Sequence, residues 1–370
     1  MRTDLLIVGG GPAGLNAAYK AASYGLKTII VDKWFSLGGQ LRQQTQSYDH
    51  LPQHFAKLRG YKLADFLIDR LKPLDVTILE KHTLIGAYSD GSVGVTNEKD
   101  ILPIDAKNVL ITTGAMEEPD IFPGWTLPGV MTAGAAQILI NRERVLPGKQ
   151  ALILGSNEFA LEVAAQLHDC GIAIKGIVEN RSELLCQNEK LIARISNAEI
   201  PIVLNGVIES AIGKGKVEEA YVNHNGNNAL YDVDLICVAK GITPILEPFE
   251  VMNCDLIYRE RLGGWLPEYY GNFETTNPSI YVAGNAAGIT NMGGILLTGE
   301  IAAISAVESL NAASTVQIKE EKEYLWNELY RIEYNSVLEA RLDVINELHN
   351  EKDAQLPPLV DSLNGRLING

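Results

Sequence analysis

The chain has 370 residues, of which 46% are apolar and 21% are charged, and its formal net charge at pH 7 is −15. This length is sufficient for two or three domains with separate cores. The excess of acidic side chains argues against a nucleic-acid partner, which requires a basic surface. The apolar stretch at 5–8 is too short for a signal peptide, and no apolar run reaches the roughly 20 residues of a membrane span. We therefore expect a cytoplasmic protein without a membrane span.

Strand-like and helix-like patterns alternate along the chain, which predicts the α/β class. The first strand–helix–strand unit is expected at 4–39, and a helix with an apolar stripe at 55–73, where Pro73 ends it. Short strands are expected next, at 76–79, 83–88, 94–97 and 108–112. A Pro- and Gly-rich segment at 117–129 breaks both periodicities, so we expect the chain to cross there into a second domain.

The middle of the chain repeats this organisation. A helix near 133–141 precedes a second strand–helix–strand unit at 151–180. Another Pro- and Gly-rich stretch, 241–278, is expected to carry the chain back to the first domain. Further strands are expected at 200–205, 217–223, 233–238 and 279–284.

The C-terminal part is expected to contain an alanine-rich helix at 294–311 and one long amphipathic helix at 320–349. Residues 351–370 are polar and predict a loosely held tail. Together the patterns predict an α/β fold with two Rossmann-like, three-layer dinucleotide-binding domains, the second inserted in the first, and a C-terminal helix. The expected boundaries are 1–117 with 273–315 for the first domain, 118–272 for the second, and 316–370 for the C-terminal helix and tail.

Gly9, Gly11 and Gly14 match G-x-G-x-x-G between an apolar strand and an alanine-rich helix. The first glycine permits a tight turn, the second leaves room for a pyrophosphate, and the third lets helix and strand pack closely. The amino terminus of the helix then offers N–H groups and a positive dipole end to phosphates. Asp32 ends the next strand, where an acid accepts hydrogen bonds from ribose hydroxyls. We therefore predict a first dinucleotide site here.

The second unit differs at the same turn, because Asn157 replaces the middle glycine. Its side chain crowds an approaching pyrophosphate, although asparagine tolerates left-handed backbone. Glu179 ends the next strand and favours NAD over NADP, a preference that nearby Arg181 weakens. Two interpretations stay open: an altered site for NAD(P) or another adenine nucleotide, and a structural remnant without a ligand. The residues of this second site are Gly155, Ser156, Asn157, Glu158 and Glu179.

Four segments carry a resemblance to a known family: VGGGPAGLNAAYKAASYG at 8–25, GGQL at 38–41, VLITTGA at 109–115 and SIYVAGNAAG at 279–288. They resemble the landmarks of flavoproteins with two dinucleotide-binding domains and a thioredoxin-reductase-like fold. The resemblance covers about residues 1–312. It implies that the first site binds FAD and that the second domain is of the NAD(P)-binding type.

The resemblance also implies which residues contact FAD. These are Gly9, Gly11, Pro12, Ala13, Gly14, Asp32, Lys33, Gly39, Gln40, Thr113, Gly114, Gly284 and Asn285. In the family the last pair is usually Gly-Asp, with the carboxylate on the ribityl chain of the flavin. An asparagine oxygen still accepts a hydroxyl hydrogen bond, but without charge. We therefore expect FAD to bind with some loss of affinity.

The cysteines form no C-x-x-C pair, so neither a metal site nor an iron–sulfur cluster is expected in this chain. They are Cys170, Cys186, Cys237 and Cys254. Thioredoxin reductases carry a redox-active C-x-x-C just before their second strand–helix–strand unit, whereas this chain reads PGVMTAGAAQIL at 128–139. Dithiol chemistry is therefore not expected.

The segment TTGAMEEPDIFPGWTLPGVMTAGAAQILI, at 112–140, resembles a narrower group. It is similar to the large FAD- and nucleotide-binding subunit of sarcosine oxidase, hydrogen cyanide synthase, opine oxidase, and D-hydroxyproline or L-proline dehydrogenase complexes. The resemblance implies a hetero-oligomer in which a separate FAD subunit oxidises the amino acid and passes electrons to this one. Members often carry a cysteine-rich [2Fe-2S] domain. Since no cysteine follows Cys254, a cluster, where the enzyme requires one, is expected to come from another subunit.

The leading hypothesis is a FAD-dependent oxidoreductase that relays electrons in an amino-acid dehydrogenase or oxidase of the proline, hydroxyproline, sarcosine or opine type. The alternatives are a stand-alone NAD(P)H-dependent flavin reductase and a non-catalytic nucleotide-binding scaffold. No general base or nucleophile is assigned, because the histidines are isolated: His50, His54, His82, His168, His224 and His349. The polar residues Gln40, Arg42, Gln43 and Gln44 either line the flavin face or form a surface loop.

Overall fold

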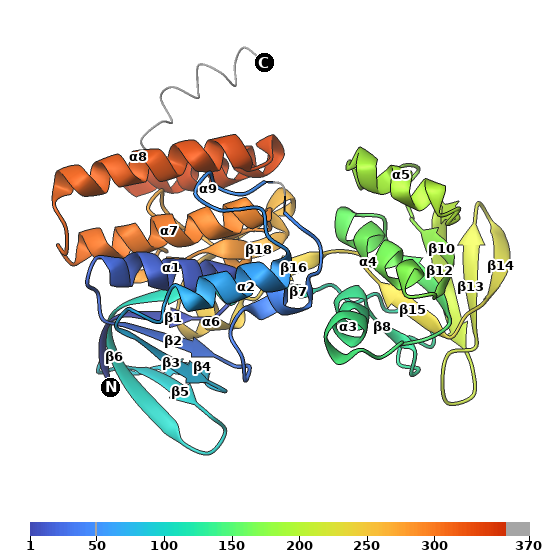
Figure 1. Cartoon of the computed structure of the whole chain (residues 1–370), viewed down its shortest axis with the longest axis horizontal. Helices are drawn as coiled ribbons and strands as arrows, with labels where there is room; N and C mark the ends of the chain where they lie inside the picture. Colours follow the sequence, from blue (N-terminus) through green and yellow to red (C-terminus); the bar gives the residue numbers. More distant parts are fainter. Residues whose placement is uncertain (49, 353–370) are drawn as a thin grey trace, which may run out of the picture. The chain divides into compact units, whose positions relative to one another are not determined.

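The computed structural model describes residues 1–48 and 50–352, with side chains up to residue 348. The predicted tail at 351–370 lies outside the described residues from 353 on. Strands and helices alternate through most of the described chain, and its two parallel sheets confirm the predicted α/β, Rossmann-like fold (Figure 1).

The chain packs as two compact units. Unit 1 comprises Met1–Met116 and the chain from Thr243 onward, and unit 2 is the inserted segment Glu117–Ile242. The chain crosses between them in two short strands, β7 (Ala115–Glu117) and β16 (Ile242–Pro244), which pair with each other. The chain therefore enters and leaves unit 2 through this one pair of neighbouring strands.

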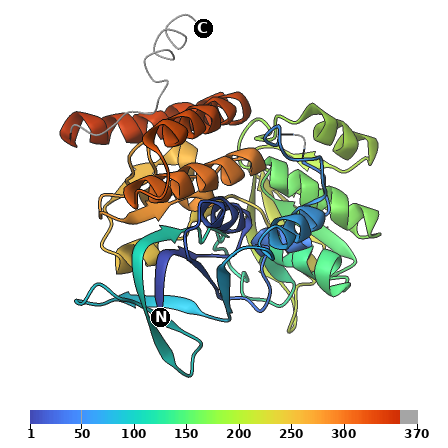
Figure 2. The ribbon, with the colours of Figure 1, turned by 60° about the vertical axis from the view of Figure 1, so that its left-hand side comes forward.

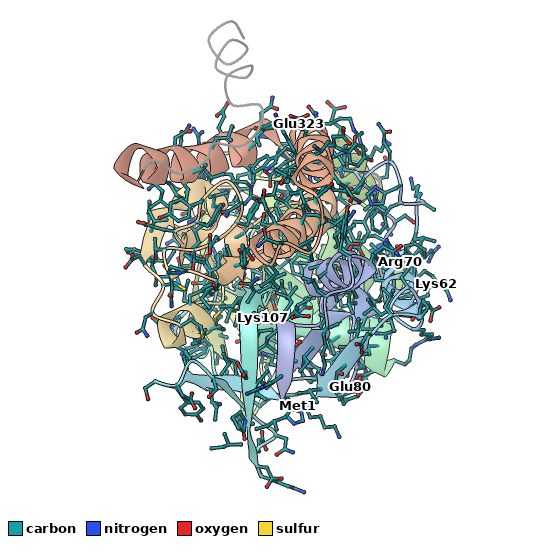
Figure 3. The ribbon with its side chains drawn as sticks, turned by 90° about the vertical axis from the view of Figure 1, so that its left-hand side faces the viewer. Met1, Lys62, Arg70, Glu80, Lys107 and Glu323 are labelled. Carbon is teal, nitrogen blue, oxygen red and sulfur yellow. The ribbon has the colours of Figure 1, made fainter. Side chains whose placement is uncertain are left out.

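Unit 1 is built on a mostly parallel sheet. Its strands are β1 (Arg2–Val8), β2 (Thr28–Asp32), β3 (Val76–Glu80), β4 (Thr83–Ala87), β5 (Val93–Thr96), β6 (Ile101–Ile111) and β19 (Ile280–Val282). Five of them run parallel in the order β3-β2-β1-β6-β19, and the first half of β6 also pairs with the antiparallel β4–β5 hairpin. Near the amino end of the sheet, Lys107 of β6, labelled in Figure 3, pairs with Asp4 of β1 at 2.8 Å.

Helices cover this sheet in two layers. They are α1 (Pro12–Ser23), α2 (Gly60–Asp69), α7 (Met292–Ser309), α8 (Thr315–Ile332) and α9 (Asn335–Lys352). α7 packs between α1 and α8, and in Figure 2 it runs beneath the pair α8 and α9. Asn16 and Lys20 of α1 donate to the buried carboxylate of Glu300 in α7, at 2.8 and 3.0 Å. This polar contact fixes how the two helices pack.

α7 is predominantly apolar apart from a few polar residues such as Glu300, and its residues are buried from Met292 to Val307. Among the described residues it is the one helix long and apolar enough to cross a membrane, and 78% of its apolar window is buried inside the structure. A helix that is predominantly apolar and covered by neighbours has the pattern of a core helix.

Short elements complete unit 1. They are α6 (Glu247–Val251), β17 (Leu256–Arg259), β18 (Gly264–Pro267) and the 3-10 turns η1 (Gly39–Gln43), η3 (Glu260–Leu262) and η4 (Gly284–Ala287). The residues between 243 and 272 thus pack in unit 1, whereas the sequence placed the return of the chain at 272. The physical reason is that Phe249, Leu266 and Tyr269 are fully buried in the same core as β1.

Unit 2 has three layers. Its parallel strands are β8 (Val130–Thr132), β9 (Gln150–Leu154), β10 (Ala173–Val178), β11 (Ile202–Val203) and β15 (Leu235–Val238), in the order β11-β10-β9-β15-β8. The helices are α3 (Ala133–Ile138), continued by a π-turn η2 (Leu139–Glu143), α4 (Glu158–Asp169) and α5 (Glu189–Asn197). An antiparallel sheet contains β12 (Gly206–Ile212), β13 (Glu219–His224) and β14 (Asn227–Asp232). Alternate residues of β9 face opposite layers, Ile153 the helices and Leu152 the antiparallel sheet.

Two predicted helices differ from the observed ones. The helix expected at 55–73 begins only at Gly60, because Arg59 has extended backbone and forms the N-cap. The single helix expected at 320–349 is wrong: α8 ends at Ile332, and α9 starts at Asn335. The apolar period continues across this break, so the pattern alone cannot reveal it. The break coincides with Glu333, whose side chain is completely buried.

Candidate dinucleotide-binding sites

The first glycine-rich turn connects β1 to α1 at the carboxyl edge of the sheet of unit 1. Gly9 has a φ of +112°, a conformation that favours glycine, and a Cβ atom at Gly14 would lie 2.0 Å from the carbonyl oxygen of Gly9. At Gly11, by contrast, a Cβ atom would meet no described atom within 4 Å. The three glycines thus show the turn, the close packing and the open space that a bound pyrophosphate requires.

The amino terminus of α1 faces this open space without a capping side chain among the described residues. Gly11 is the N-cap, Pro12 occupies the first turn, and no acidic residue lies in that turn. The first N–H groups of a helix have no partner within the helix, and they carry the positive end of its dipole. This arrangement suits the phosphates of a dinucleotide.

Asp32 braces the glycine-rich turn from the end of β2. Its carboxylate is 8% exposed and accepts hydrogen bonds from the backbone N–H groups of Gly10, at 2.6 Å, and Trp34, at 2.7 Å. Each carboxylate oxygen has a second lone pair, so a ribose hydroxyl can still donate to it. Lys33, the next predicted contact, is exposed.

Two threonines follow the end of β6. Thr112, which the sequence reasoning missed, donates its hydroxyl to the carbonyl oxygen of Gly9 at 2.8 Å and so holds the turn in place. The Oγ1 atom of Thr113 is buried and has no hydrogen-bond partner among the described residues. Gly114 has a φ of +78°. Because buried polar atoms are normally satisfied, the orphaned hydroxyl of Thr113 fits a site that a ligand completes.

The GGQ segment lies against the same turn. The N–H of Gly38 donates to the carbonyl oxygen of Gly10 at 2.8 Å, and a Cβ atom at Gly39 would lie 3.0 Å from the Cα atom of Gly11. Gln40 is exposed and accepts a hydrogen bond from Gln43. Arg42 forms an ion pair with Asp65 at 2.9 Å. Gln43 is buried, and Gln44 accepts a hydrogen bond from the hydroxyl of Tyr48. The glycines of this segment therefore border the open space.

Gly284 and Asn285 reach the site from the far end of the chain. Gly284 has a φ of +69°, and a Cβ atom there would lie 2.8 Å from the Cβ atom of Ala13. The Oδ1 atom of Asn285 accepts the N–H of Thr290 at 3.1 Å. The structure thus brings η4, which follows β19, next to the first turn of α1.

The second glycine-rich turn keeps the geometry of the first at its start. Gly155 has a φ of +110°, and its N–H donates to the strand beside it, as that of Gly9 does. The helix that follows is different. Asn157 caps α4: its Oδ1 atom accepts the N–H of Ala160 at 2.9 Å, and its Nδ2 atom donates to the carbonyl oxygen of Ala239 at 2.8 Å. An amide oxygen of the chain thus takes one of the donors that no side chain caps at the first turn.

The polar groups next to Asn157 are also engaged within unit 2. The hydroxyl of Ser156 donates to Glu179 at 2.6 Å and accepts the N–H of Leu185 at 3.0 Å. Glu179 is 3% exposed. Glu158 accepts a hydrogen bond from Asn188 at 2.8 Å. The segment after β10 therefore folds back onto the turn where a second nucleotide is expected.

One of the cysteines, Cys186, lies against the second turn, where its backbone N–H donates to the carbonyl oxygen of Ser156 at 2.9 Å. Cys170 is exposed, and Cys186, Cys237 and Cys254 are buried, all with free thiols. Burial raises the pKa of each buried thiol, which keeps it protonated and weakly nucleophilic at neutral pH. Within the described part of the chain, no group of three or more His, Cys, Asp or Glu side chains could hold a metal ion. The segment in place of the C-x-x-C of thioredoxin reductases forms β8 and α3.

Known proteins share both the sequence pattern and the fold. An opine oxidase subunit from Agrobacterium tumefaciens (strain Ach5) is 28% identical over 84% of this chain and 67% of its own length. The alpha subunit of sarcosine oxidase from Rhizobium meliloti (strain 1021) is 29% identical over 66% of this chain and 25% of its own. The chain thus spans about two thirds of the first relative and a quarter of the second.

Two solved structures show the same fold. L-proline dehydrogenase from P. horikoshii has a TM-score of 0.68 and 22% identity, and the match covers 90% of this chain and 59% of that one. T. acidophilum thioredoxin reductase has a TM-score of 0.69 and 21% identity, and the match covers 84% and 99%. The predicted thioredoxin-reductase-like fold is therefore confirmed.

The family itself follows from a match over most of the chain. Residues 3–315 match the pyridine nucleotide-disulphide oxidoreductase model. Proteins of this family are oxidoreductases that bind FAD and NAD(P). The open pyrophosphate space at Gly11, the orphaned hydroxyl of Thr113 and the uncapped α1 are the features of this chain that fit FAD. The chain is a member of the pyridine nucleotide-disulphide oxidoreductase family.

Proposed function

We propose that the chain is the FAD-dependent, electron-relaying component of a multi-subunit dehydrogenase or oxidase that acts on an amino acid of the proline, hydroxyproline, sarcosine or opine type. The contrast between the two turns carries the proposal. The amino terminus of α1, at Gly11, has no side-chain cap, whereas the side chain of Asn157 caps the amino terminus of α4 in unit 2. Electrons therefore enter the flavin from another subunit rather than from a nicotinamide in this chain.

The names of the relatives support this proposal. The matching polypeptides of opine oxidase, sarcosine oxidase and hydrogen cyanide synthase are each named as subunits of those enzymes. The partners that we propose are a [2Fe-2S] subunit and a substrate-oxidising FAD subunit, with the complex located in the cytoplasm. The buried thiols and the thiol-free segment at 128–139 leave the flavin without a disulfide acceptor in the described part of this chain.

The residues of the first site divide the binding of FAD among them. FAD supplies the redox chemistry when bound, and the protein supplies orientation and electrostatics. The N–H groups at the start of α1 hold the pyrophosphate, and Asp32 accepts from the adenosine ribose. Thr113 gains a partner, and Asn285 accepts from a hydroxyl of the flavin side chain. Each assignment uses a donor or acceptor that can form a further hydrogen bond.

Anaerobic flavin reduction tests the proposal. The chain is purified alone and together with its native partners, loaded with FAD, and mixed with NADH, NADPH or a set of imino and N-methyl amino acids. We expect bound FAD, slow bleaching by either nicotinamide in the isolated chain, and rapid bleaching by an amino acid only in the complex. A chain that stays free of FAD, or one that NADH bleaches rapidly without partners, contradicts the proposal.

A stand-alone NAD(P)H-dependent flavin reductase is the second candidate. It is supported by Gly155, which keeps the φ of +110° of a nucleotide-binding turn, and by Glu179 at the end of β10. Asn157→Gly tests the cap: freeing the N–H of Ala160 should tighten NADH binding by about tenfold, at a cost of about 1 kcal/mol in stability, mostly because the hydrogen bond to the carbonyl oxygen of Ala239 is also lost. Calorimetric titration of both proteins with NADH measures the change. Equal affinities would show that the cap does not limit binding.

A further inference from the structure

The two C-terminal helices are connected to the predicted FAD site by a buried polar network. The helices α8 and α9 follow the family match, which stops at residue 315, where α8 begins. Thioredoxin reductase aligns over 99% of its own length but only 84% of this chain. Most of α8 and α9 is therefore an addition to that fold, and the question is what the addition does.

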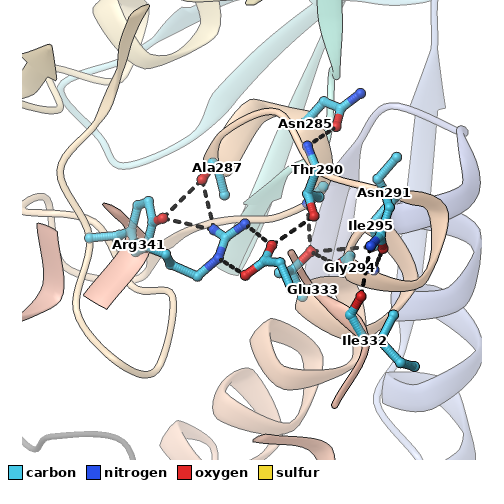
Figure 4. Close-up of polar contacts among 12 residues, drawn as sticks. Asn285, Ala287, Thr290, Asn291, Gly294, Ile295, Ile332, Glu333 and Arg341 are labelled. Atoms are coloured by element: carbon cyan, nitrogen blue, oxygen red, sulfur yellow. Dashed lines mark hydrogen bonds and ion pairs between the residues drawn. The ribbon is translucent and has the colours of Figure 1, made fainter. Parts of the chain in front are cut away.

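The network is centred on an ion pair at the break between the helices (Figure 4). The Glu333 carboxylate and the Arg341 guanidinium are both 0% exposed. They form two parallel hydrogen bonds, from Nη2 to Oε1 at 2.7 Å and from Nε to Oε2 at 3.0 Å. Such a bidentate pair fixes both side chains in position as well as neutralising their charges.

Three contacts extend from this break to the segment 285–291, which contains Asn285. The hydroxyl of Thr290 donates to Oε1 of Glu333 at 2.7 Å. Nη1 of Arg341 donates to the carbonyl oxygen of Ala287 at 2.8 Å. Nδ2 of Asn291 donates to the carbonyl oxygen of Ile332 at 2.8 Å, while its Oδ1 caps α7. Both the middle and the end of the segment are thus held by α8 and α9.

Two glycines allow this close approach. A Cβ atom at Gly293 would lie 2.4 Å from the Cγ2 atom of Ile332, and one at Gly294 would lie 2.3 Å from the hydroxyl of Thr290. Gly293 therefore leaves room for the end of α8, and Gly294 leaves room for the Thr290 side chain that reaches Glu333. Within the segment, the N–H of Thr290 donates to Oδ1 of Asn285 at 3.1 Å, so the position of Thr290 orients the Asn285 side chain.

We propose that Glu333 and Arg341 are positioning residues for the flavin: through Thr290 and Ala287 they fix the segment that presents Asn285, and α8–α9 thereby belongs to the FAD site. The proposal rests on the assignment of FAD to the first site. A buried ion pair contributes little net stability, because desolvation offsets its attraction, and apolar replacements are often as stable. Its geometric effect, a fixed segment 285–291, is therefore the consequence that the contacts support. The fixed segment also compensates for the uncharged Asn285 at a position where the family usually has aspartate. An acceptor that is already oriented loses less conformational entropy when FAD binds.

The decisive variants change Thr290, because it links the pair to the segment without belonging to the pair. In Thr290→Val the hydroxyl is lost while Glu333 keeps both bonds to Arg341. We expect the Kd for FAD to rise about tenfold, the equivalent of one lost hydrogen bond, and the visible spectrum of bound flavin to shift. Thr290→Ser retains the hydroxyl and should restore both. Because the apo form also contains this hydrogen bond, apo Thr290→Val should lose on the order of 1 kcal/mol of stability, which Thr290→Ser should retain.

A matched control uses an exposed ion pair on α9. Glu339 of α9 pairs with Arg261 at 3.3 Å, and both side chains are exposed. Glu339→Gln should leave the Kd and the spectrum unchanged, whereas Glu333→Gln should weaken FAD binding at least as much as Thr290→Val. If Glu333→Gln does not fold, the comparison of the valine and serine variants still decides. Equal FAD affinity and equal spectra in wild type and Thr290→Val overturn this inference; a wild type that binds no FAD overturns the proposed function instead.

Discussion

Gly11 and Asn157 occupy the same position in the two copies of one turn, and they have opposite effects on the helix that follows. Gly11 has no side chain and leaves the N–H groups of α1 free for a ligand. Asn157 places its own amide oxygen on the N–H of Ala160. A single side chain thus decides whether the positive end of a helix dipole faces a ligand site or is satisfied within the protein.

Replacing Gly11 separates ligand binding from folding. Gly11→Ala adds a Cβ atom where no described atom lies within 4 Å, on extended backbone that alanine adopts easily. We expect the free energy of unfolding of the apo chain to change by less than about 1 kcal/mol, and the Kd for FAD to rise at least about tenfold. Urea unfolding and FAD titration measure the two effects.

The control for this variant is Gly14→Ala. Its Cβ atom would lie 2.0 Å from the carbonyl oxygen of Gly9, so the fold itself should lose stability with or without FAD. If Gly11→Ala loses as much apo stability as Gly14→Ala, the open space at Gly11 is not reserved for a ligand.

Thr113 gives a second test at the residue scale. Its buried hydroxyl has no partner among the described residues, so Thr113→Val removes an unsatisfied polar atom. We expect the apo chain to be as stable as the wild type or more stable by about 1 kcal/mol, while FAD binding weakens several-fold. Unfolding curves measured with and without FAD should show unchanged or raised stability of the apo variant and a smaller stabilisation by FAD. An unchanged FAD affinity would show that Thr113 has no contact with the cofactor.

At the scale of elements, the packing of α1 on α7 depends on one buried carboxylate. Burial by itself raises the pKa of Glu300, but the hydrogen bond to His54 and the charge of Lys20 outweigh it and lower the pKa to about 2. A carboxylate with a depressed folded-state pKa stabilises the fold above its unfolded value and loses that contribution as the pH falls. The contacts of Glu300 should therefore make the protein sensitive to acid.

The expected acid sensitivity can be measured with Glu300→Gln. From the ordinary value of 4.5 to about 2, the shift corresponds to a contribution on the order of 3 kcal/mol, present above pH 4.5 and lost as the pH falls towards 2. The variant should be less stable at neutral pH and show a flatter decline in acid. Glu321→Gln, which removes the more exposed partner of Lys20, is the control and should change the profile little. Parallel acid profiles of wild type and Glu300→Gln would contradict this account.

At the scale of the whole molecule, unit 2 has the properties of an independent domain. It is a continuous segment, 117–242, with its own parallel sheet and with apolar cores on both faces of that sheet. Unit 1 contains all the residues predicted to contact FAD. The two units should therefore respond differently to the cofactor.

An excised segment 117–242 tests this division. We expect it to fold cooperatively, because its parallel sheet and both of its apolar cores lie within one continuous segment. FAD at 100 times its Kd should stabilise the full chain by about 2.7 kcal/mol and leave the fragment unchanged. Thermal unfolding of both proteins, with and without FAD, is the measurement. Stabilisation of the fragment by FAD would move the FAD site to unit 2.

Much of this protein could be predicted from its sequence, because the signals are local. Periodicity predicted the α/β class, and the spacing of Gly9, Gly11 and Gly14 predicted the turn that the structure shows. Both depend on backbone conformation and side-chain alternation within a few residues. The family resemblance depended on the same short motifs, and the family match confirms it.

Other features were decided only by the tertiary structure, because they depend on partners distant in the chain. The break at Glu333 interrupts an unbroken apolar period, and its reason is a buried pair with Arg341 that also reaches Thr290. The stretch after residue 243 reads as a linker, yet its aromatic side chains fill the core of unit 1. Sequence alone showed that Asn157 replaces a glycine, but only the fold shows its amide capping α4, since its second partner, the carbonyl of Ala239, directly follows β15 and is 82 residues away in the chain.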